Sequence, residues 1–192
     1  YVLAVRIGKL RTRLVEQRTH LEQQRAELAE ALERISTLAT RDELTGLPNR
    51  RAAIERMQHE LAVRARPEPL MSLAVIDIDH FKRINDSHGH AGGDAVLRRF
   101  SERAQTVMRR GDTLARWGGE EFLLVMPATG MAQGMAALNR IRQAMRDASF
   151  DDVAPDTPVT FSAGVSECVG EHDMEAAVAR ADAAMYEAKR AG

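Results

Sequence analysis

The stretch that decides the fold runs from Thr113 to Met126 and reads TLARWGGEEFLLVM. Two runs of strand-favouring residues, 113–117 and 122–126, stand on either side of the glycine pair Gly118-Gly119. Only a tight turn fits between runs that lie so close together, so we predict a β-hairpin. The turn of this hairpin would present Glu120 and Glu121 next to each other.

Other strands and helices are expected around this hairpin. The apolar run LMSLAVIDID at 70–79 and the run VTFSAGVS at 159–166 predict two further strands. Helices are expected at about 50–64, 94–109, 131–146 and 174–190, and a loop with a short helix at 81–93. This order predicts an α/β fold, an α+β sandwich of the ferredoxin-like kind with antiparallel strands in its sheet. Neither a G-x-G-x-x-G motif after a strand nor a P-loop occurs, which excludes both nucleotide-binding folds.

The first forty residues follow a different pattern. They contain no proline, and apolar or permissive residues recur at alternating steps of three and four, which is typical of a coiled coil. We therefore predict a coiled-coil dimerisation and signalling helix at 1–40 and a globular domain at 41–192. Gln17 and Gln24 would weaken the seam and help to set its register. The seam consists of Ile7, Leu14, Leu21, Leu28 and Ile35 with Leu3, Leu10, Gln17, Gln24, Ala31 and Leu38.

Composition narrows the class of partner. The net charge is -1 and aromatic residues make up 4%, which argues against binding to nucleic acid. The single cysteine, Cys168, excludes a disulfide framework and a cysteine metal site, and it fits a reducing cytoplasm. Tyr1–Val5 is apolar, and the charged residues that follow it up to Arg13 are all basic, like the cytoplasmic end of a transmembrane helix. The alternative is the first turns of an amphipathic helix. We expect a cytoplasmic domain and leave an upstream sensor or inner-membrane anchor open.

Acidic residues gather where the first globular strand ends. Asp77 and Asp79 alternate onto one face, and a hairpin paired beside that strand would bring Glu120 and Glu121 close to Asp77. Carboxylates that face one another need a cation, and hard oxygen ligands indicate Mg²⁺ or Mn²⁺. The alternative is a set of separate, solvated acids. The glycine pair favours the metal site, because it lets a backbone or a phosphate approach closely.

A polar segment follows the same strand directly. Backbone amides from Phe81 onward could cradle phosphates, and Lys82 could contact one as a point charge. Asn85 offers a donor and an acceptor, and Asp94 offers acceptors for the paired N–H edge of guanine. The alternative for Asp94 is a helix N-cap. No cysteine or third histidine lies at a spacing that would make zinc ligands of the two histidines in this segment.

Five ordered blocks in residues 40–192 resemble the GGDEF family. They are the turn from Asp42 to Arg51, the run Asp77–Asp86, the run Gly89–Asp94, the signature Arg116–Phe122 and the run Met185–Lys189. In the signature, Glu120 stands where the family name has aspartate, a common functional variant. The resemblance implies diguanylate cyclase activity, in which two GTP molecules condense to cyclic di-GMP and two pyrophosphates. Two weaker alternatives are an inactive domain that senses GTP or cyclic di-GMP, and a dimerisation relay.

The resemblance also implies roles for individual residues. Asp77, the carbonyl of Ile78 and Glu120 would hold Mg²⁺ or Mn²⁺, with Glu121 assisting in metal or proton handling and Glu120 as the preferred base. The residues implied in substrate binding are Phe81, Lys82, Asn85, His90, Asp94, Gly118, Gly119 and Lys189.

One domain would hold one GTP, so the family's chemistry implies a homodimer, which a parallel coiled coil would hold together. Arg109 and Asp112 resemble the family's R-x-x-D site for inhibition by cyclic di-GMP, and Arg140 would contribute from a neighbouring helix. The alternative for Arg109 is a basic helix end followed by a turn.

Overall fold

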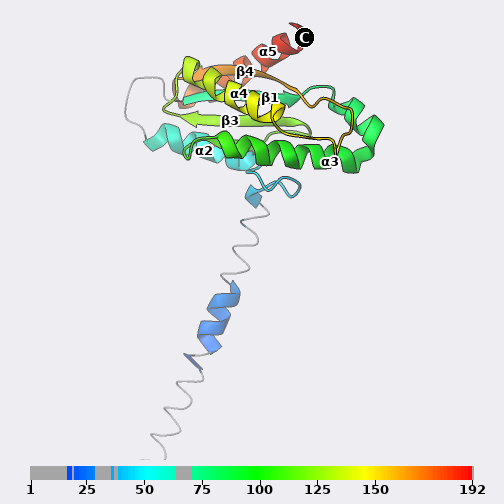
Figure 1. Ribbon diagram of the computed structural model, residues 1–192. Coiled ribbons are helices and arrows are strands. Elements are labelled where there is room, and N and C mark those ends of the chain that lie inside the picture. Colours follow the sequence, from blue (N-terminus) through cyan, green and yellow to red (C-terminus); the bar gives the residue numbers. More distant parts are fainter. Residues whose placement is uncertain (1–16, 19, 29–35, 37–38, 64–70, 192) are drawn as a thin grey trace, which may run out of the picture. The chain divides into compact units, whose positions relative to one another are not determined.

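The structure, a computed structural model, describes residues 17–18, 20–28, 36, 39–63 and 71–191 (Figure 1). The chain forms two compact units, residues 1–39 and 40–192. In the first unit, residues 17–18 and 20–28 are helical, and the rest of the predicted seam falls almost wholly outside the described residues. Leu21 and Leu28, two seam positions, are 50% and 61% exposed in the single chain.

No helix in the described part of the chain is long and apolar enough to cross a membrane. The segment Tyr1–Val5, on which the membrane interpretation depended, lies outside the described residues.

The second unit is built on a four-stranded antiparallel sheet with the order β2-β3-β1-β4. Its strands are β1 (Met71–Ile78), β2 (Thr113–Arg116), β3 (Glu121–Pro127) and β4 (Phe161–Cys168). The hairpin of β2 and β3 is confirmed, and it pairs with β1 through β3 as expected. The sheet order and the succession β1-α3-β2-β3-α4-β4 confirm the ferredoxin-like architecture.

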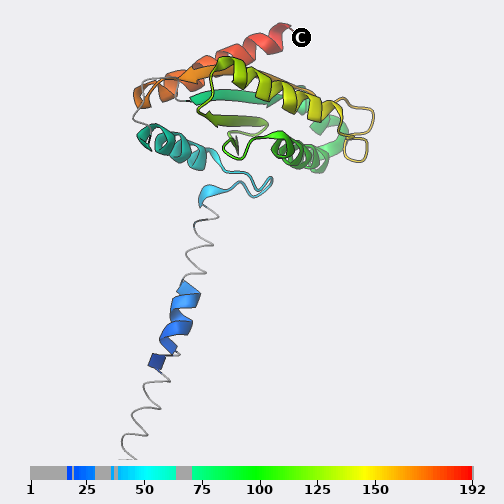
Figure 2. The ribbon, with the colours of Figure 1, turned by 60° about the vertical axis from the view of Figure 1, so that its left-hand side comes forward.

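Helices cover both faces of this sheet (Figure 2). One face packs against α3 (Phe81–Val107) and α4 (Met131–Arg146), and the other against α2 (Arg50–Val63) and α5 (Met174–Ala191). Successive residues of a strand point to opposite faces, so Ile76 lies in the first core and Val75 in the second. β1 is buried along its whole length because helices cover both of its sides.

Helix α3 differs from the prediction. Residues 81–93 were expected to form a loop with a short helix, yet the helix runs from Phe81 to Val107 with a kink at Gly89, where φ is 71° and ψ is 171°. Only glycine adopts this backbone conformation readily, so the chain bends there and resumes its helix. Asp94 consequently lies inside the helix, and its interpretation as an N-cap is wrong.

Helix α5 lies unusually close to β4. A Cβ atom at Gly164 would lie 2.1 Å from the carbonyl oxygen of Ala181 and 2.3 Å from the amide nitrogen of Met185, so only glycine permits this approach. The close contact lays α5 over the face of β1 and β4 and brings Lys189 to the end of β1 where the acids lie.

Candidate active site

The acidic cluster forms on the face of the sheet that α5 covers. Asp77 and Glu121 are directly opposite each other in the β1–β3 ladder, so their side chains share one face. Lys189 reaches down from α5, and its Nζ lies 2.7 Å from Oδ1 of Asp77. The structure therefore brings together three of the predicted site residues from three separate elements.

Asp77 is the most buried acid of the cluster, at 6% exposure. Its Oδ1 has the nearby ammonium of Lys189 but no partner with hydrogen-bond geometry. A buried carboxylate oxygen without a hydrogen bond is costly unless a cation compensates it. The protein's own lysine supplies part of that compensation and leaves lone pairs on the carboxylate for another cation.

Glu120 feels the same crowding of negative charge. Burial raises the pKa of its carboxyl group, and the charges of Asp77 and Glu121 raise it further, while Lys189 acts in the opposite direction. The net pKa lies above the ordinary value for glutamate. The four side chains thus form one electrostatic unit, in which a bound cation would relieve the repulsion between the carboxylates.

Main-chain hydrogen bonds hold the turn in place. The amides of Trp117 and Gly118 donate to the carbonyl of Glu121, at 2.8 and 3.2 Å, and close the loop upon itself. The amide of Ile78 donates to the carbonyl of Glu120 at 3.3 Å and ties the turn to the end of β1. The acids therefore project from a backbone fixed at both ends.

The sequence interpretation gave no role to Arg116 and Asp42, which brace this turn. Arg116 donates through Nη1 to both carboxylate oxygens of Asp42, at 3.1 and 3.0 Å, and through Nη2 to the carbonyl of Gly119 at 2.7 Å. Asp42 in turn accepts from the amide and hydroxyl of Thr45, at 2.9 and 2.7 Å. In the sequence, Arg116 stands directly before the turn and Asp42 stands just after the predicted helix at 1–40. Only the fold shows that these two residues are in contact.

Asp79 lies apart from the metal candidates. Its two carboxylate oxygens each accept a hydrogen bond of 2.7 Å, from the hydroxyls of Thr160 and Ser162. The amide of Asp79 also donates to the carbonyl of Thr160 at 2.9 Å. Asp79 therefore anchors the chain before β4 to the end of β1, although its position in the sequence suggested a place beside Asp77.

Five of the predicted nucleotide-binding residues lie along the first half of α3: Phe81, Lys82, Asn85, His90 and Asp94. Lys82 and His90 are exposed, and Asn85 and Asp94 are half-buried. The side chain of Phe81 is buried in the core, so only its backbone is available to a phosphate. The first half of α3 therefore presents polar side chains at or near its surface.

The residues present fit a divalent cation. Within the described residues, no three Asp, Glu, His or Cys side chains form a complete ligand set of their own. Mg²⁺ binds proteins mostly through one or two carboxylates and completes its shell with water and substrate phosphate. Asp77 and Glu120, with the carbonyl of Ile78, suit such a partial set of hard oxygen donors.

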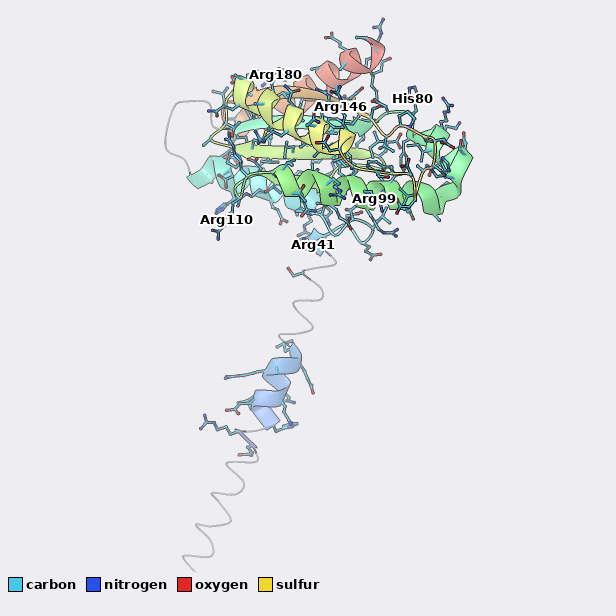
Figure 3. All side chains as sticks on the ribbon, viewed as in Figure 1. Arg41, His80, Arg99, Arg110, Arg146 and Arg180 are labelled. Carbon is cyan, nitrogen blue, oxygen red and sulfur yellow. The ribbon has the colours of Figure 1, made fainter. Side chains whose placement is uncertain are left out.

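A second cluster lies at the other end of β2. Arg109 and Asp112 line a hollow of about 350 Å³ together with Arg41 and Arg110. The amide of Arg109 donates to Oδ2 of Asp112 at 3.2 Å, so the two predicted inhibition-site residues lie in one turn. Figure 3 labels two of these arginines, Arg41 and Arg110, on the lower side of the globular unit.

Arg140 lines a neighbouring hollow of about 410 Å³ on α4. Its Nε donates to the carbonyl of Val107 at 3.3 Å, close to the end of α3. Arg140 therefore lies close to the end of α3, but it lines a different hollow from Arg109 and Asp112.

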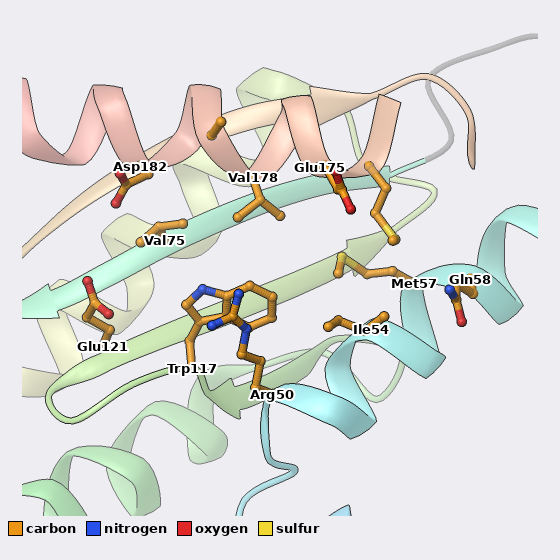
Figure 4. A pocket seen from close by; sticks show the side chains of 12 residues that line it. Arg50, Ile54, Met57, Gln58, Val75, Trp117, Glu121, Glu175, Val178 and Asp182 are labelled. Carbon is orange, nitrogen blue, oxygen red and sulfur yellow. The ribbon is translucent and has the colours of Figure 1, made fainter. Parts of the chain in front are cut away.

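A cavity of about 520 Å³ lies beside the acidic turn, between α2 and α5 (Figure 4). Trp117 and Glu121 line it, and the guanidinium of Arg50 stacks 4.6 Å from the centre of the Trp117 ring. This cation–π contact holds the first residue of the turn against α2.

The antiparallel sheet and the braced acidic turn define a class of ferredoxin-like domain with a carboxylate site at the tip of its β2–β3 hairpin. Comparison with known proteins makes this class specific. The sequence profile described as "Diguanylate cyclase, GGDEF domain" matches residues 39–192. The chain therefore belongs to the GGDEF family.

Two relatives illustrate how similar the chain is to known members. It is 46% identical over 154 residues to the diguanylate cyclase DgcP of Pseudomonas aeruginosa, a match that covers 80% of this chain and 23% of the relative. It is 42% identical over 171 residues to the response regulator PleD of Caulobacter vibrioides, covering 86% of this chain and 37% of that protein. The chain thus spans well under half the length of these relatives.

Solved structures show the same fold. The coiled coil and GGDEF domain of DgcB from Caulobacter crescentus, in complex with c-di-GMP, superimposes with a TM-score of 0.81 at 31% identity and covers 95% of each chain. The diguanylate cyclase SiaD from Pseudomonas aeruginosa, in complex with its activator SiaC, has a TM-score of 0.76 at 35% identity and covers 99% of this chain and 73% of its own.

Proposed function

We propose that the protein is a diguanylate cyclase that condenses two GTP molecules into cyclic di-GMP and releases two pyrophosphates. The observation that carries the proposal is the pairing of Asp77 with Glu121 across β1 and β3, with Glu120 at the turn and Lys189 above them. Membership of a family whose profile is described as diguanylate cyclase supports the same activity.

In the proposed reaction, the 3′-hydroxyl oxygen of each GTP forms a bond to the α-phosphorus of the other. The bond from that phosphorus to pyrophosphate breaks, and the hydroxyl proton passes to the acidic turn, where we assign it to Glu120. Asp77, Glu120 and the Ile78 carbonyl would hold Mg²⁺ or Mn²⁺, which lowers the pKa of a bound hydroxyl and offsets charge on the transferring phosphoryl group.

The remaining assignments concern binding. Lys189 and Lys82 would neutralise phosphate charge, and the backbone at Phe81 and at the two turn glycines would leave room for phosphates. Asn85 and Asp94 would read the hydrogen-bonding edges of guanine, with His90 near the nucleotide. Glu121 would support Glu120 from the adjacent position.

The direct test is incubation of the protein with GTP and Mg²⁺, followed by chromatography for cyclic di-GMP. We expect product from the wild type and none from Glu120→Gln, which keeps the size of the side chain and removes its charge. Glu43→Gln is a matched control, because Glu43 is an exposed acid that the proposal does not use. Formation of product by Glu120→Gln at the wild-type rate would refute the assigned mechanism.

We further propose that the active species is a homodimer held by a parallel coiled coil in residues 1–40. Each domain would supply one GTP, so the two half-sites must face each other, and a tether raises their effective concentration. The exposure of Leu21 and Leu28 supports this proposal, because seam leucines are buried only by a partner helix.

Deletion of residues 1–38 tests the dimer. Specific activity should fall at low protein concentration and recover at high concentration, because untethered domains must meet by diffusion. Activity that does not depend on the tether at any concentration would contradict the proposal.

A further inference from the structure

Helix α3 carries both proposed guanine-reading residues, but on different sides of its kink. The first arm, residues 81–88, carries Asn85, and the second arm, residues 90–107, carries Asp94. The angle at Gly89 therefore sets the distance between the two side chains. Any contact that fixes this angle also fixes the shape of the guanine site.

The two arms pack closely against each other on one side. A Cβ atom at Gly93 would lie 2.0 Å from Oδ1 of Asn85, and one at Gly92 would lie 2.6 Å from Cβ of His88. The second arm thus lies in contact with the face of the first arm that carries Asn85 and His88. Packing alone, however, limits only how near the arms come and leaves open how far they can separate.

A segment from elsewhere in the chain joins the two arms. The bridging loop, residues 149–157, follows α4 and leads to β4. Arg99 of the second arm, labelled on α3 in Figure 3, donates to the Ser149 carbonyl at 3.0 Å and pairs with Asp152, with Nη2 2.7 Å from Oδ2. One end of the loop is thereby attached to the second arm.

The other end of the bridging loop reaches the first arm. Nε2 of His88 lies 2.9 Å from the hydroxyl oxygen of Thr157. The same hydroxyl lies 3.3 Å from the Pro155 carbonyl oxygen, which accepts from it within the loop. Between the two attachments, Phe150 and Ala154 are buried at 6% and 1% exposure and hold the loop against the core.

We propose that His88 and Thr157 are positioning residues for guanine recognition. Their hydrogen bond holds the first arm of α3 to the bridging loop. Arg99 holds the same loop to the second arm. The pair thereby keeps Asn85 at its working distance from Asp94. This inference rests on the proposed function, since it assumes that these two side chains read the base of GTP.

The test is Thr157→Val, which keeps the shape of the side chain and removes its hydroxyl. The KM for GTP should rise about three- to tenfold, the factor that one lost hydrogen bond supplies, while kcat at saturation stays within about twofold. The preference for GTP over ITP, which lacks the 2-amino group, should fall by a similar factor. Thr157→Ser, which keeps a hydroxyl, should restore the KM and the preference for GTP.

Thr106→Val is the matched control, because the hydroxyl of Thr106 bonds only within α3, to the Arg103 carbonyl. Hydrogen exchange of the amides in residues 81–94 should become faster in Thr157→Val and stay unchanged in Thr106→Val. A Thr157→Val protein with wild-type KM and wild-type preference for GTP would overturn the positioning role.

Failure of the proposed function would look different. A wild type that forms no cyclic di-GMP refutes the cyclase, whatever Thr157 does. In that case hydrogen exchange in residues 81–94 still decides whether Thr157 holds the first arm, because the measurement needs no enzymatic activity. Exchange that is the same in Thr157→Val as in the wild type would overturn the positioning role.

Discussion

Two turns, one on either side of the short strand β2, differ in how they are held in place and in how exposed their charged side chains are. The acidic turn, residues 117–120, is braced by the end of β1 and by Arg116, which bonds both Asp42 and the Gly119 carbonyl. The basic turn, residues 109–112, has local bonds: the Arg109 amide donates to Asp112 Oδ2, and the Asp112 amide donates to the Arg109 carbonyl at 3.0 Å. Arg109 and Arg110 are exposed, whereas the acids are half-buried or buried.

The difference matches what each turn is proposed to do. Stabilising a transition state requires groups that are already in place, because reorganising them would add to the barrier. A site that only senses product can order itself when an anionic ligand arrives, since arginine forks pair well with phosphate and guanine. The braced acidic turn thus suits catalysis, and the exposed basic turn at the other end of β2 suits regulation.

Of the substitutions that test the difference between the two turns, Arg116→Ala should have the largest effect. This change frees the Gly119 carbonyl and leaves Asp42 without its ion pair, so the acidic turn loses its brace. We expect kcat to fall about 100-fold, the usual cost of a misplacement of about 1 Å, which steady-state kinetics with GTP will measure.

Arg116→Lys serves as the control for charge. A lysine keeps the positive charge but cannot hold two acceptors with a planar fork, so activity should recover only in part. Full activity in Arg116→Ala would show that the turn is rigid without its brace.

A smaller effect is expected from Arg109→Ala at the basic turn. We propose that cyclic di-GMP binds there, and removal of one charge-assisted fork should weaken binding about 10- to 30-fold, as measured by calorimetric titration. Arg98→Ala removes the same charge from an exposed position of α3 that lines neither hollow, and it should leave binding unchanged. Equal binding by the wild type and Arg109→Ala, or no binding by the wild type, would refute the assignment.

The smallest effect concerns acid stability at the brace. Burial raises the pKa of Asp42, but hydrogen bonds from Thr45 and Arg116 and the charge of Arg116 lower it more, so the net pKa lies below the ordinary 3.8. A depressed pKa contributes stability above pH 3.8, and that contribution is lost as the pH falls through the folded-state value.

Denaturant unfolding of wild type and Asp42→Asn measures this contribution. The wild type should be more stable by about 1 kcal/mol at pH 7, and the difference should shrink as the pH drops below about 4. A difference that stays constant down to pH 2 would show that the charge of Asp42 does not carry it.

Much of the fold was predictable because it depends on local patterns. The hairpin follows from two strand-favouring runs around a glycine pair, and α4 lies at the bounds expected for it, Met131–Arg146. Helix α3 was predicted less well, because its three glycines at 89, 92 and 93 look like a loop. In the structure one of them makes a kink and the other two make room for packed side chains, which is a tertiary reason to keep glycine.

The candidate site shows the same division. Asp77, Glu120 and Glu121 stood out because acids at the end of an apolar strand and in a glycine turn are unusual. Asp79 looked equivalent to Asp77, yet hydroxyls from β4 and from the chain before it take up both of its oxygens. Alternation along a strand predicts the side to which a side chain points, but it does not predict which residues the side chain contacts there.

The sequence by itself determined the order of the elements, the hairpin, the acids at its tip and the family resemblance, because each depends on residues near one another in the chain. Only the tertiary structure decided that Lys189 lies over Asp77, that Arg116 holds Asp42 to Gly119 and that Thr157 reaches His88. These contacts join residues far apart in the chain, and their formation depends on how the helices pack on the sheet.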